Sequence, residues 1–246
     1  MRSRTLLALL LSLVAAATTT NLAEAGAAAG PPATASAAPA TAGALTVAAS
    51  ATAGSRTPLE RAVAGIPQSG IRLGRPDAPL AMIVFADLQC PFCARFAATT
   101  LPRIVRDWVA SGRLQIRYRM LSVIGTDSTR AAQFAVAAGD QGLLWQTTAR
   151  MFARQRGENT GYVTDRFLRA VGESVDGLDA EEAMARRSSR AVMDSLDFSR
   201  RRARQLHVAG VPMLAIRRTD GRMKRFDGDV QRYGAVAAAL RVLQRR

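Results

Sequence analysis

The chain has 246 residues, of which 48% are hydrophobic, enough for a sizeable core, so a wholly disordered protein is excluded. Its net charge of +15 comes from basic residues that are almost all arginine. Such a charge is typical of proteins that bind nucleic acid or anionic surfaces. Here the basic residues are scattered along amphipathic segments, without a basic tail or a zinc-finger spacing. We therefore expect a solvated, arginine-rich surface and no nucleic-acid partner.

The first 25 residues have the organisation of an export signal. Arg2 and Arg4 precede an apolar run over residues 6–17, and Ala23-Glu24-Ala25 resembles a cleavage site. The apolar run is shorter than the roughly 20 residues of a membrane-spanning helix, which favours a cleaved signal peptide over the alternative of an uncleaved anchor. We expect an exported, extracytoplasmic protein, either periplasmic or attached to the cell envelope.

Residues 26–65 differ in composition from the rest of the chain. Up to about residue 57 they are almost entirely Ala, Gly, Thr, Ser and Pro, and prolines interrupt any helical pattern. Such a segment has too little apolar surface to offset the entropy cost of ordering it. The composition predicts a flexible linker over 26–65 and a folded domain over 66–246.

The folded domain begins with the pattern of a β-α-β unit. Residues 80–86 are a continuous apolar run bounded by Pro79 and Asp87, as expected for a buried central strand. From Pro91 to Gly112 apolar residues recur at helical spacing. Residues 114–120 then alternate apolar and polar, which predicts a strand with one face in the core.

The second half of the domain predicts a helical block, a hairpin and a last helix. Only helical patterns occur from about 126 to 207, and Asp179 with Glu182 has the spacing of a helix start. After this block, two strands over 213–217 and 222–226 flank a turn with the sequence Thr-Asp-Gly. A final amphipathic helix is predicted over 231–243. The fold class is therefore α/β with an inserted all-helical subdomain at about 126–207.

The only two cysteines, Cys90 and Cys93, form a Cys-Pro-Phe-Cys motif at the predicted strand–helix junction. As a structural disulfide the pair would close a four-residue loop, which stabilises by only about 2 kcal/mol. A tetrahedral zinc site needs two more ligands, and the chain has no third cysteine and one histidine. A copper site with Met213 or His207 remains a minor alternative.

A redox-active dithiol explains where the motif lies. At a helix N-terminus the Cys90 sulfur faces unpaired amide N–H groups and the positive end of the helix dipole, which stabilise the thiolate. Cys93 lies one turn further along, within reach of Cys90, where it can attack a mixed disulfide. We therefore predict that Cys90 is the nucleophile and Cys93 the resolving thiol. Asp87, three residues before Cys90, is interpreted as a turn residue rather than a catalytic one.

The segment Phe85-Ala-Asp-Leu-Gln-Cys-Pro-Phe-Cys-Ala-Arg-Phe96 resembles the active-site segment of DsbA-like thioredoxin-fold proteins. The resemblance extends over about residues 67–246, through segments at 73–79, 128–145, 177–179 and 210–212. It implies a thioredoxin-like fold interrupted by a helical subdomain. It also implies that Pro212 follows a cis peptide bond beside the cysteines, and that Val211 offers backbone hydrogen bonds to an extended substrate.

Two positions depart from the family pattern. Phe92 stands where DsbA has a histidine between the cysteines, and Val84 stands where DsbA and thioredoxin have a buried acid. The resemblance implies that substrates contact Val211, Pro212, Pro91 and Phe92. A carboxylate proton relay at position 84 is excluded.

The leading hypothesis is an enzyme that forms disulfides in unfolded or reduced exported polypeptides and is reoxidised by a membrane redox partner. The alternatives are an extracytoplasmic disulfide reductase or isomerase on the same fold, and a module that binds metal through the dithiol. We expect no cofactor and no resident metal ion in the enzyme.

Overall fold

The computed structural model describes residues 55–245. The predicted signal peptide at 1–25 and the linker up to residue 54 lie outside this range. Within it, six strands form one mixed sheet in the order β1-β2-β4-β3-β5-β6. The strands are β1 (Gln68–Ser69), β2 (Arg72–Leu73), β3 (Leu80–Ala86), β4 (Leu114–Met120), β5 (Met213–Arg218) and β6 (Lys224–Arg225).

Eight α-helices and one π-helical segment accompany the strands within residues 55–245. They are α1 (Pro58–Val63), α2 (Pro91–Ile104) with the π segment η1 (Val105–Val109), α3 (Thr126–Asp140), α4 (Leu144–Ala153), α5 (Asp165–Gly172), α6 (Ala180–Arg186), α7 (Arg190–Gln205) and α8 (Tyr233–Gln244). None of these helices is long and apolar enough to cross a bilayer.

The two central strands have the predicted bounds. All seven residues of β3 are buried, as the continuous apolar run required, and β3 pairs in parallel with β4 and antiparallel with β5. On β4 the core residues Leu114, Ile116 and Tyr118 alternate with Gln115 and Arg117. This order confirms the predicted strand–helix–strand unit, helical block, hairpin and final helix.

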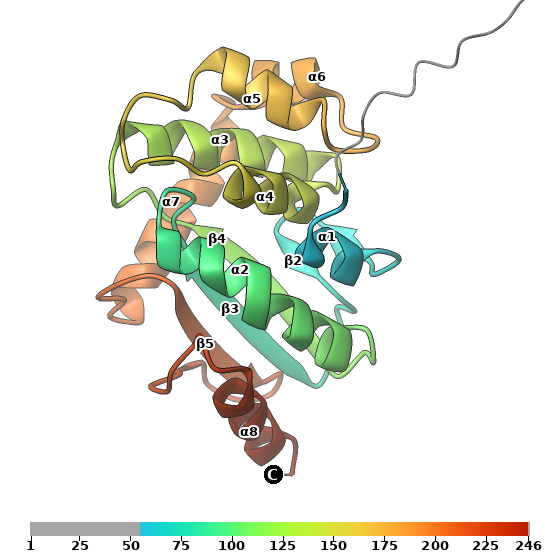
Figure 1. Cartoon of the computed structure of the whole chain (residues 1–246). Coiled ribbons are helices and arrows are strands. Elements are labelled where there is room, and N and C mark those ends of the chain that lie inside the picture. The colour runs from blue at the N-terminus through green and yellow to red at the C-terminus, as the bar shows by residue number, and fades with distance from the viewer. Residues whose placement is uncertain (1–54, 246) are drawn as a thin grey trace, which may run out of the picture. The chain divides into compact units, whose positions relative to one another are not determined.

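The sheet is covered on both faces. In Figure 1, α2 crosses in front of β3 and β4, and α8 lies near β5 on the same side of the sheet. The large core cluster fills the space under these two helices. On the other face α7 packs through Ala203 against Ile83 and Phe85. Helices α3 to α6 form the inserted helical subdomain at one end of the sheet (Figure 1), while α7, the last helix of the predicted block at 126–207, packs on the sheet itself.

The predicted linker boundary at residue 65 is wrong, because α1 belongs to the folded domain. Leu59 and Val63 are each 1% exposed and lie in the main core. Thr57 and Glu60 form a capping box around Pro58 at the first helical position. The Ala- and Pro-rich composition hid this helix start, which was present in the sequence as a Thr, a Pro and a Glu at the correct spacing.

A buried ion pair fixes α1 to the helical subdomain, since Glu60 Oε1 lies 2.6 Å from Nε of Arg150 on α4, with both side chains under 10% exposed. We expect Glu60→Ala to lower the free energy of unfolding by about 3 kcal/mol, because it leaves a buried guanidinium without this carboxylate. Glu181→Ala, which breaks an exposed pair with Arg169, is the control and should cost at most about 1 kcal/mol. Urea denaturation measures both. Equal losses would show that α1 is a peripheral attachment.

Candidate active site

The two cysteines lie where β3 passes into α2. After β3 ends at Ala86, the chain turns, and the Cys90 N–H donates to the Asp87 carbonyl at 3.1 Å. Cys90 is the N-cap of α2, with extended backbone angles, and Pro91 is the first helical residue. Both cysteines are free thiols; Cys90 is 5% exposed and Cys93 is fully buried. The predicted placement of the motif at a helix N-terminus is confirmed.

The two thiols have opposite acidities. The pKa of Cys90 is lowered to about 6, first by a hydrogen bond from the Cys93 thiol and also by the backbone N–H groups of Cys93 and Phe92, against burial and the charge of Asp87. Burial, and then the hydrogen bond to Cys90, raises the pKa of Cys93 far above its ordinary value. At neutral pH the reduced pair therefore holds one thiolate, on Cys90, and one proton, on Cys93.

Asp87 anchors the turn that precedes the cysteines. Its side chain is fully buried and accepts hydrogen bonds from the backbone N–H groups of Gln89, Val123 and Ile124 and from the Ser128 hydroxyl, at 2.7–3.1 Å. These contacts support the turn-residue interpretation and extend it. One carboxylate joins the active-site turn to the loop that follows β4 and to the start of α3.

Asp87→Asn should have two separable effects. Each carboxylate oxygen of Asp87 accepts two hydrogen bonds, and in asparagine one of these oxygens becomes an NH2 group that cannot accept them. We therefore expect the free energy of unfolding to fall by about 3 kcal/mol. Removing the negative charge should also lower the pKa of Cys90 below its wild-type value, because that charge opposes the thiolate. Asp227→Asn, at an exposed position paired with Arg225, is the control with the same charge change. A rise in the pKa of Cys90 would contradict the assigned electrostatic effect.

The loop between α7 and β5 faces Cys90. The peptide bond between Val211 and Pro212 is cis, as the resemblance implies, and the Cys90 thiol donates to the Val211 carbonyl at 3.6 Å. On the other side of the motif, Pro91 is exposed and the Phe92 ring is 60% exposed. The Phe92 carbonyl accepts a hydrogen bond from Gln231. The structure thus places the Val211 carbonyl beside the thiol and leaves Pro91 and Phe92 open to solvent.

Four further residues near the motif were not predicted from the sequence: Gln89, Tyr118, Asn159 and Tyr162. Gln89 donates to the Tyr162 hydroxyl at 2.7 Å and accepts from the Asn159 N–H at 2.9 Å, so it ties the active-site turn to the loop between α4 and α5. Tyr118 on β4 is buried, and both burial and the nearby cysteine charges raise its pKa. The two hydrogen bonds of Gln89 join residues 70 and 73 positions apart, so no local sequence pattern signals them.

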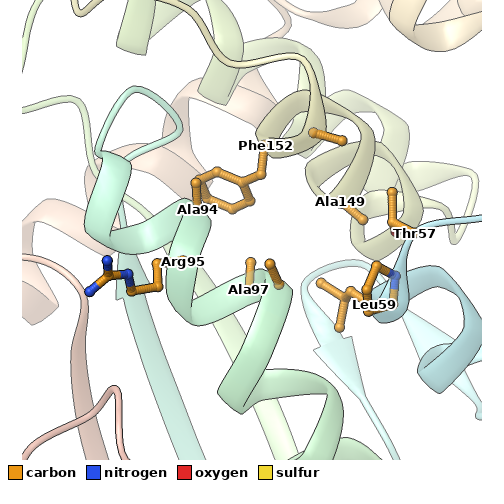
Figure 2. Close-up of a pocket in the computed structure, with 10 residues that line it drawn as sticks. Thr57, Leu59, Ala94, Arg95, Ala97, Ala149 and Phe152 are labelled. Carbon is orange, nitrogen blue, oxygen red and sulfur yellow. The ribbon is translucent and has the colours of Figure 1, made fainter.

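An apolar pocket of about 280 Å³ lies beside the same helix, between α1, α2 and α4. Figure 2 shows Phe152 of α4 turned toward Ala94 of α2, with Leu59 on the α1 side and Arg95 directed away from α4. Neither cysteine lines this pocket. The pocket is therefore separate from the reacting thiols.

The residues present offer little to a metal ion. Among residues 55–245, no three His, Cys, Asp or Glu side chains gather as a metal site would require. His207, one of the two extra copper ligands considered, is exposed, while Met213 is buried under α7. The ligands available for a metal ion would therefore be the two thiols and at most the thioether of Met213.

The comparisons with known proteins agree with the geometry. The family model described as Thioredoxin matches residues 67–225, more than half of the chain. A probable disulfide bond formation protein D of Bacillus anthracis is 27% identical over 147 residues, which cover 58% of this chain and 68% of that protein. The thiol:disulfide interchange protein DsbG of Escherichia coli is 37% identical over 73 residues, 30% of this chain and 27% of that protein.

The fold has counterparts among solved structures. Oxidised BdbD from Bacillus subtilis aligns with a TM-score of 0.63 at 16% identity, covering 74% of this chain and 98% of that one. Together with the relatives named above, the mixed sheet with its inserted helical block and the Cys-Pro-Phe-Cys motif at a helix N-terminus define a thiol–disulfide oxidoreductase. The chain belongs to the thioredoxin family.

Proposed function

We propose that the protein is an extracytoplasmic oxidase that introduces disulfides into exported polypeptides through Cys90 and Cys93. The observation that carries this proposal is the Cys90 thiol with a pKa of about 6, beside a fully buried Cys93 whose pKa is raised. A thiol of low pKa is a good leaving group, and the thiolate exists only in the reduced pair, so its stabilisation favours reduction of the enzyme and oxidation of the substrate.

The reaction proceeds by two thiol–disulfide exchanges. A substrate thiolate attacks Sγ of Cys90 in the Cys90–Cys93 disulfide; a substrate–Cys90 bond forms, and Cys93 leaves and is protonated. A second substrate thiolate attacks the substrate sulfur of this mixed disulfide, and Cys90 leaves as a thiolate. The substrate dithiol loses two electrons, and the enzyme disulfide gains them. A membrane redox partner then accepts these electrons and restores the disulfide.

Polypeptide binding is assigned to the surfaces around Cys90. An extended substrate would hydrogen-bond to the backbone of Val211, whose carbonyl lies 3.6 Å from the Cys90 sulfur, and would lie against Pro212. Phe92, 60% exposed, and Pro91 supply apolar contact on the other side. These contacts involve backbone and apolar groups, which suits substrates of varied sequence.

Refolding of a reduced protein that has several native disulfides tests the oxidase role. With oxidised enzyme in excess and no other oxidant, we expect rapid loss of substrate thiols, and Cys90→Ser enzyme should give only the background rate. A protein with scrambled disulfides, offered to the reduced enzyme, tests the isomerase alternative. Fast rearrangement of that substrate, together with slow oxidation of the reduced one, would replace the oxidase role by that of an isomerase or reductase.

A further inference from the structure

The sheet face turned away from α2 carries a cluster of arginines. On β4, Arg117 and Arg119 alternate with the core residues, and Arg117 lies directly opposite Arg72 of β2. Arg217 of β5 lies opposite Ala81 of β3. Arg202 of α7 lines the same hollow as Arg117, Arg119 and Arg217. Like charges on directly opposed residues destabilise a sheet, so this arrangement has an electrostatic cost.

These arginines line a hollow of about 700 Å³ between the sheet, α7 and the β5–β6 hairpin, which we call the arginine hollow. Its floor and walls include Ile83 and Phe198, and its charged lining residues are Arg117, Arg119, Arg202, Arg217 and Arg222. No acidic residue lines it. A smaller hollow of about 400 Å³ shares Arg117 and Arg119 with it and adds Arg72; the acid there, Asp140, pairs with Arg186.

Arg202 donates to the Gln205 side chain and Arg217 to the carbonyls of Thr219 and Gly221, but the other guanidinium groups have unused donors. Among residues 55–245, no carboxylate forms an ion pair with Arg72, Arg117 or Arg119, and the Nε atoms of Arg72 and Arg119 are buried without a hydrogen-bond partner. Arg119 instead stacks on the Phe198 ring at 4.4 Å, which fixes its plane. Residues 1–54 contain a single acid, Glu24, so the chain itself has little charge to offer the hollow.

Burial and repulsion between neighbouring arginines both lower the pKa values of Arg117 and Arg119. The pKa of Arg119 is lowered to about 10 by burial and by the charges of Arg117 and Arg202. Burial and the charges of Arg72 and Arg217 likewise lower the pKa of Arg117. An anion bound among these arginines would offset both the burial and the mutual repulsion of their charges.

We propose that the arginine hollow binds a multivalent phosphate, such as a diphosphate or a longer polyphosphate chain. The planar guanidinium fork matches phosphate oxygens in bidentate geometry, and several forks that converge on one hollow suit a ligand with several negative charges. A volume of about 700 Å³ accommodates a small-molecule ligand. The site lies on the opposite face of the sheet from the α2 core and goes beyond the proposed disulfide chemistry.

Titration calorimetry of the purified protein with tripolyphosphate tests the site. We expect saturable binding that Arg117→Gln weakens about tenfold or more, since one charge-assisted fork is lost. Arg166→Gln, an exposed arginine on α5, carries the same charge change and should leave the affinity unchanged. Without ligand and at low salt, Arg117→Gln should melt no lower than wild type, because it relieves repulsion. Equal weakening in both variants, or absence of saturable binding together with absence of Arg117-dependent binding to the anionic vesicles described next, would overturn the proposal.

Vesicles separate the two sources of phosphate. Binding to phosphatidic acid vesicles but not to tripolyphosphate, with loss in Arg117→Gln, would identify a lipid headgroup as the ligand; the reverse would identify a free polyphosphate. Vesicles of phosphatidylcholine alone provide the baseline for both. Binding to neither probe, or vesicle binding that is the same in Arg117→Gln and wild type, would show that the arginine hollow is not a phosphate-binding site. Substrate oxidation should be unchanged in Arg117→Gln, so failure here is distinguishable from failure of the oxidase proposal.

Discussion

Replacing Cys93 with serine is expected to trap mixed disulfides between Cys90 and substrate polypeptides. Cys90 lies at the N-cap of α2 beside the Val211 carbonyl and holds the thiolate, so its attack on a substrate disulfide survives the change. The resolving thiol, fully buried behind it, is gone. Adducts should persist on non-reducing gels and disappear with reductant, and catalytic turnover should fall to background.

Cys90→Ser is the matched control for this experiment. It leaves a thiol at position 93 that is fully buried and whose pKa is raised, so it should react with neither substrates nor alkylating agents at neutral pH. Adducts that form through Cys93 alone would reverse the assigned roles of the two cysteines.

The stability of the reduced protein should depend on pH in a way that the oxidised protein does not share. The pKa of Cys90 is about 6 in the folded state and about 8.5 in an unfolded chain. Because the folded value is the lower one, the thiolate stabilises the reduced fold fully above about pH 8.5, and this contribution is lost as pH falls through about 6. Cys93, with a raised pKa, stays protonated over this range in the folded state.

Denaturation of both redox forms at several pH values measures this difference. From about pH 6 to about pH 8.5, the free energy of unfolding of the reduced form should rise by about 2 kcal/mol relative to the oxidised form, after allowing for solvent screening near the sulfur. Other titrating groups are common to both forms and cancel. A relative change near zero would mean that the fold does not stabilise the thiolate, and would favour the reductase over the oxidase.

Sequence patterns predicted the elements that have a strong local signal. The bounds of β3 and β4 followed from one fully apolar run and one strict alternation, and α6 began at Asp179 because its side chain caps the Glu182 N–H. By contrast, β1 and β2 have two residues each, too few to show any period. They are strands only because β2 pairs with β4.

Some features of the active site could likewise be predicted from local sequence, and others depend on tertiary contacts. The helix N-terminus at Cys90 and the pair of thiols could be predicted, since both depend on neighbouring residues. The four hydrogen bonds to Asp87 could not, because three of their donors lie 36 to 41 residues further along the chain. The alternation on β4 predicted that Arg117 and Arg119 share one face. That Arg72 of β2 and Arg202 of α7 join them depends on tertiary pairing.

Titration of thiolate ultraviolet absorbance in the reduced protein measures directly whether Cys90 holds the thiolate. We expect one thiolate that forms with a midpoint at a pH of about 6, is absent in Cys90→Ser, and remains in Cys93→Ser. The midpoint in Cys93→Ser should lie higher or equal, since the strongest stabilising contact of the thiolate is the Cys93 thiol. A wild-type midpoint near the free-cysteine value of about 8.5, or a transition that survives in Cys90→Ser, would show that the fold does not stabilise a thiolate on Cys90.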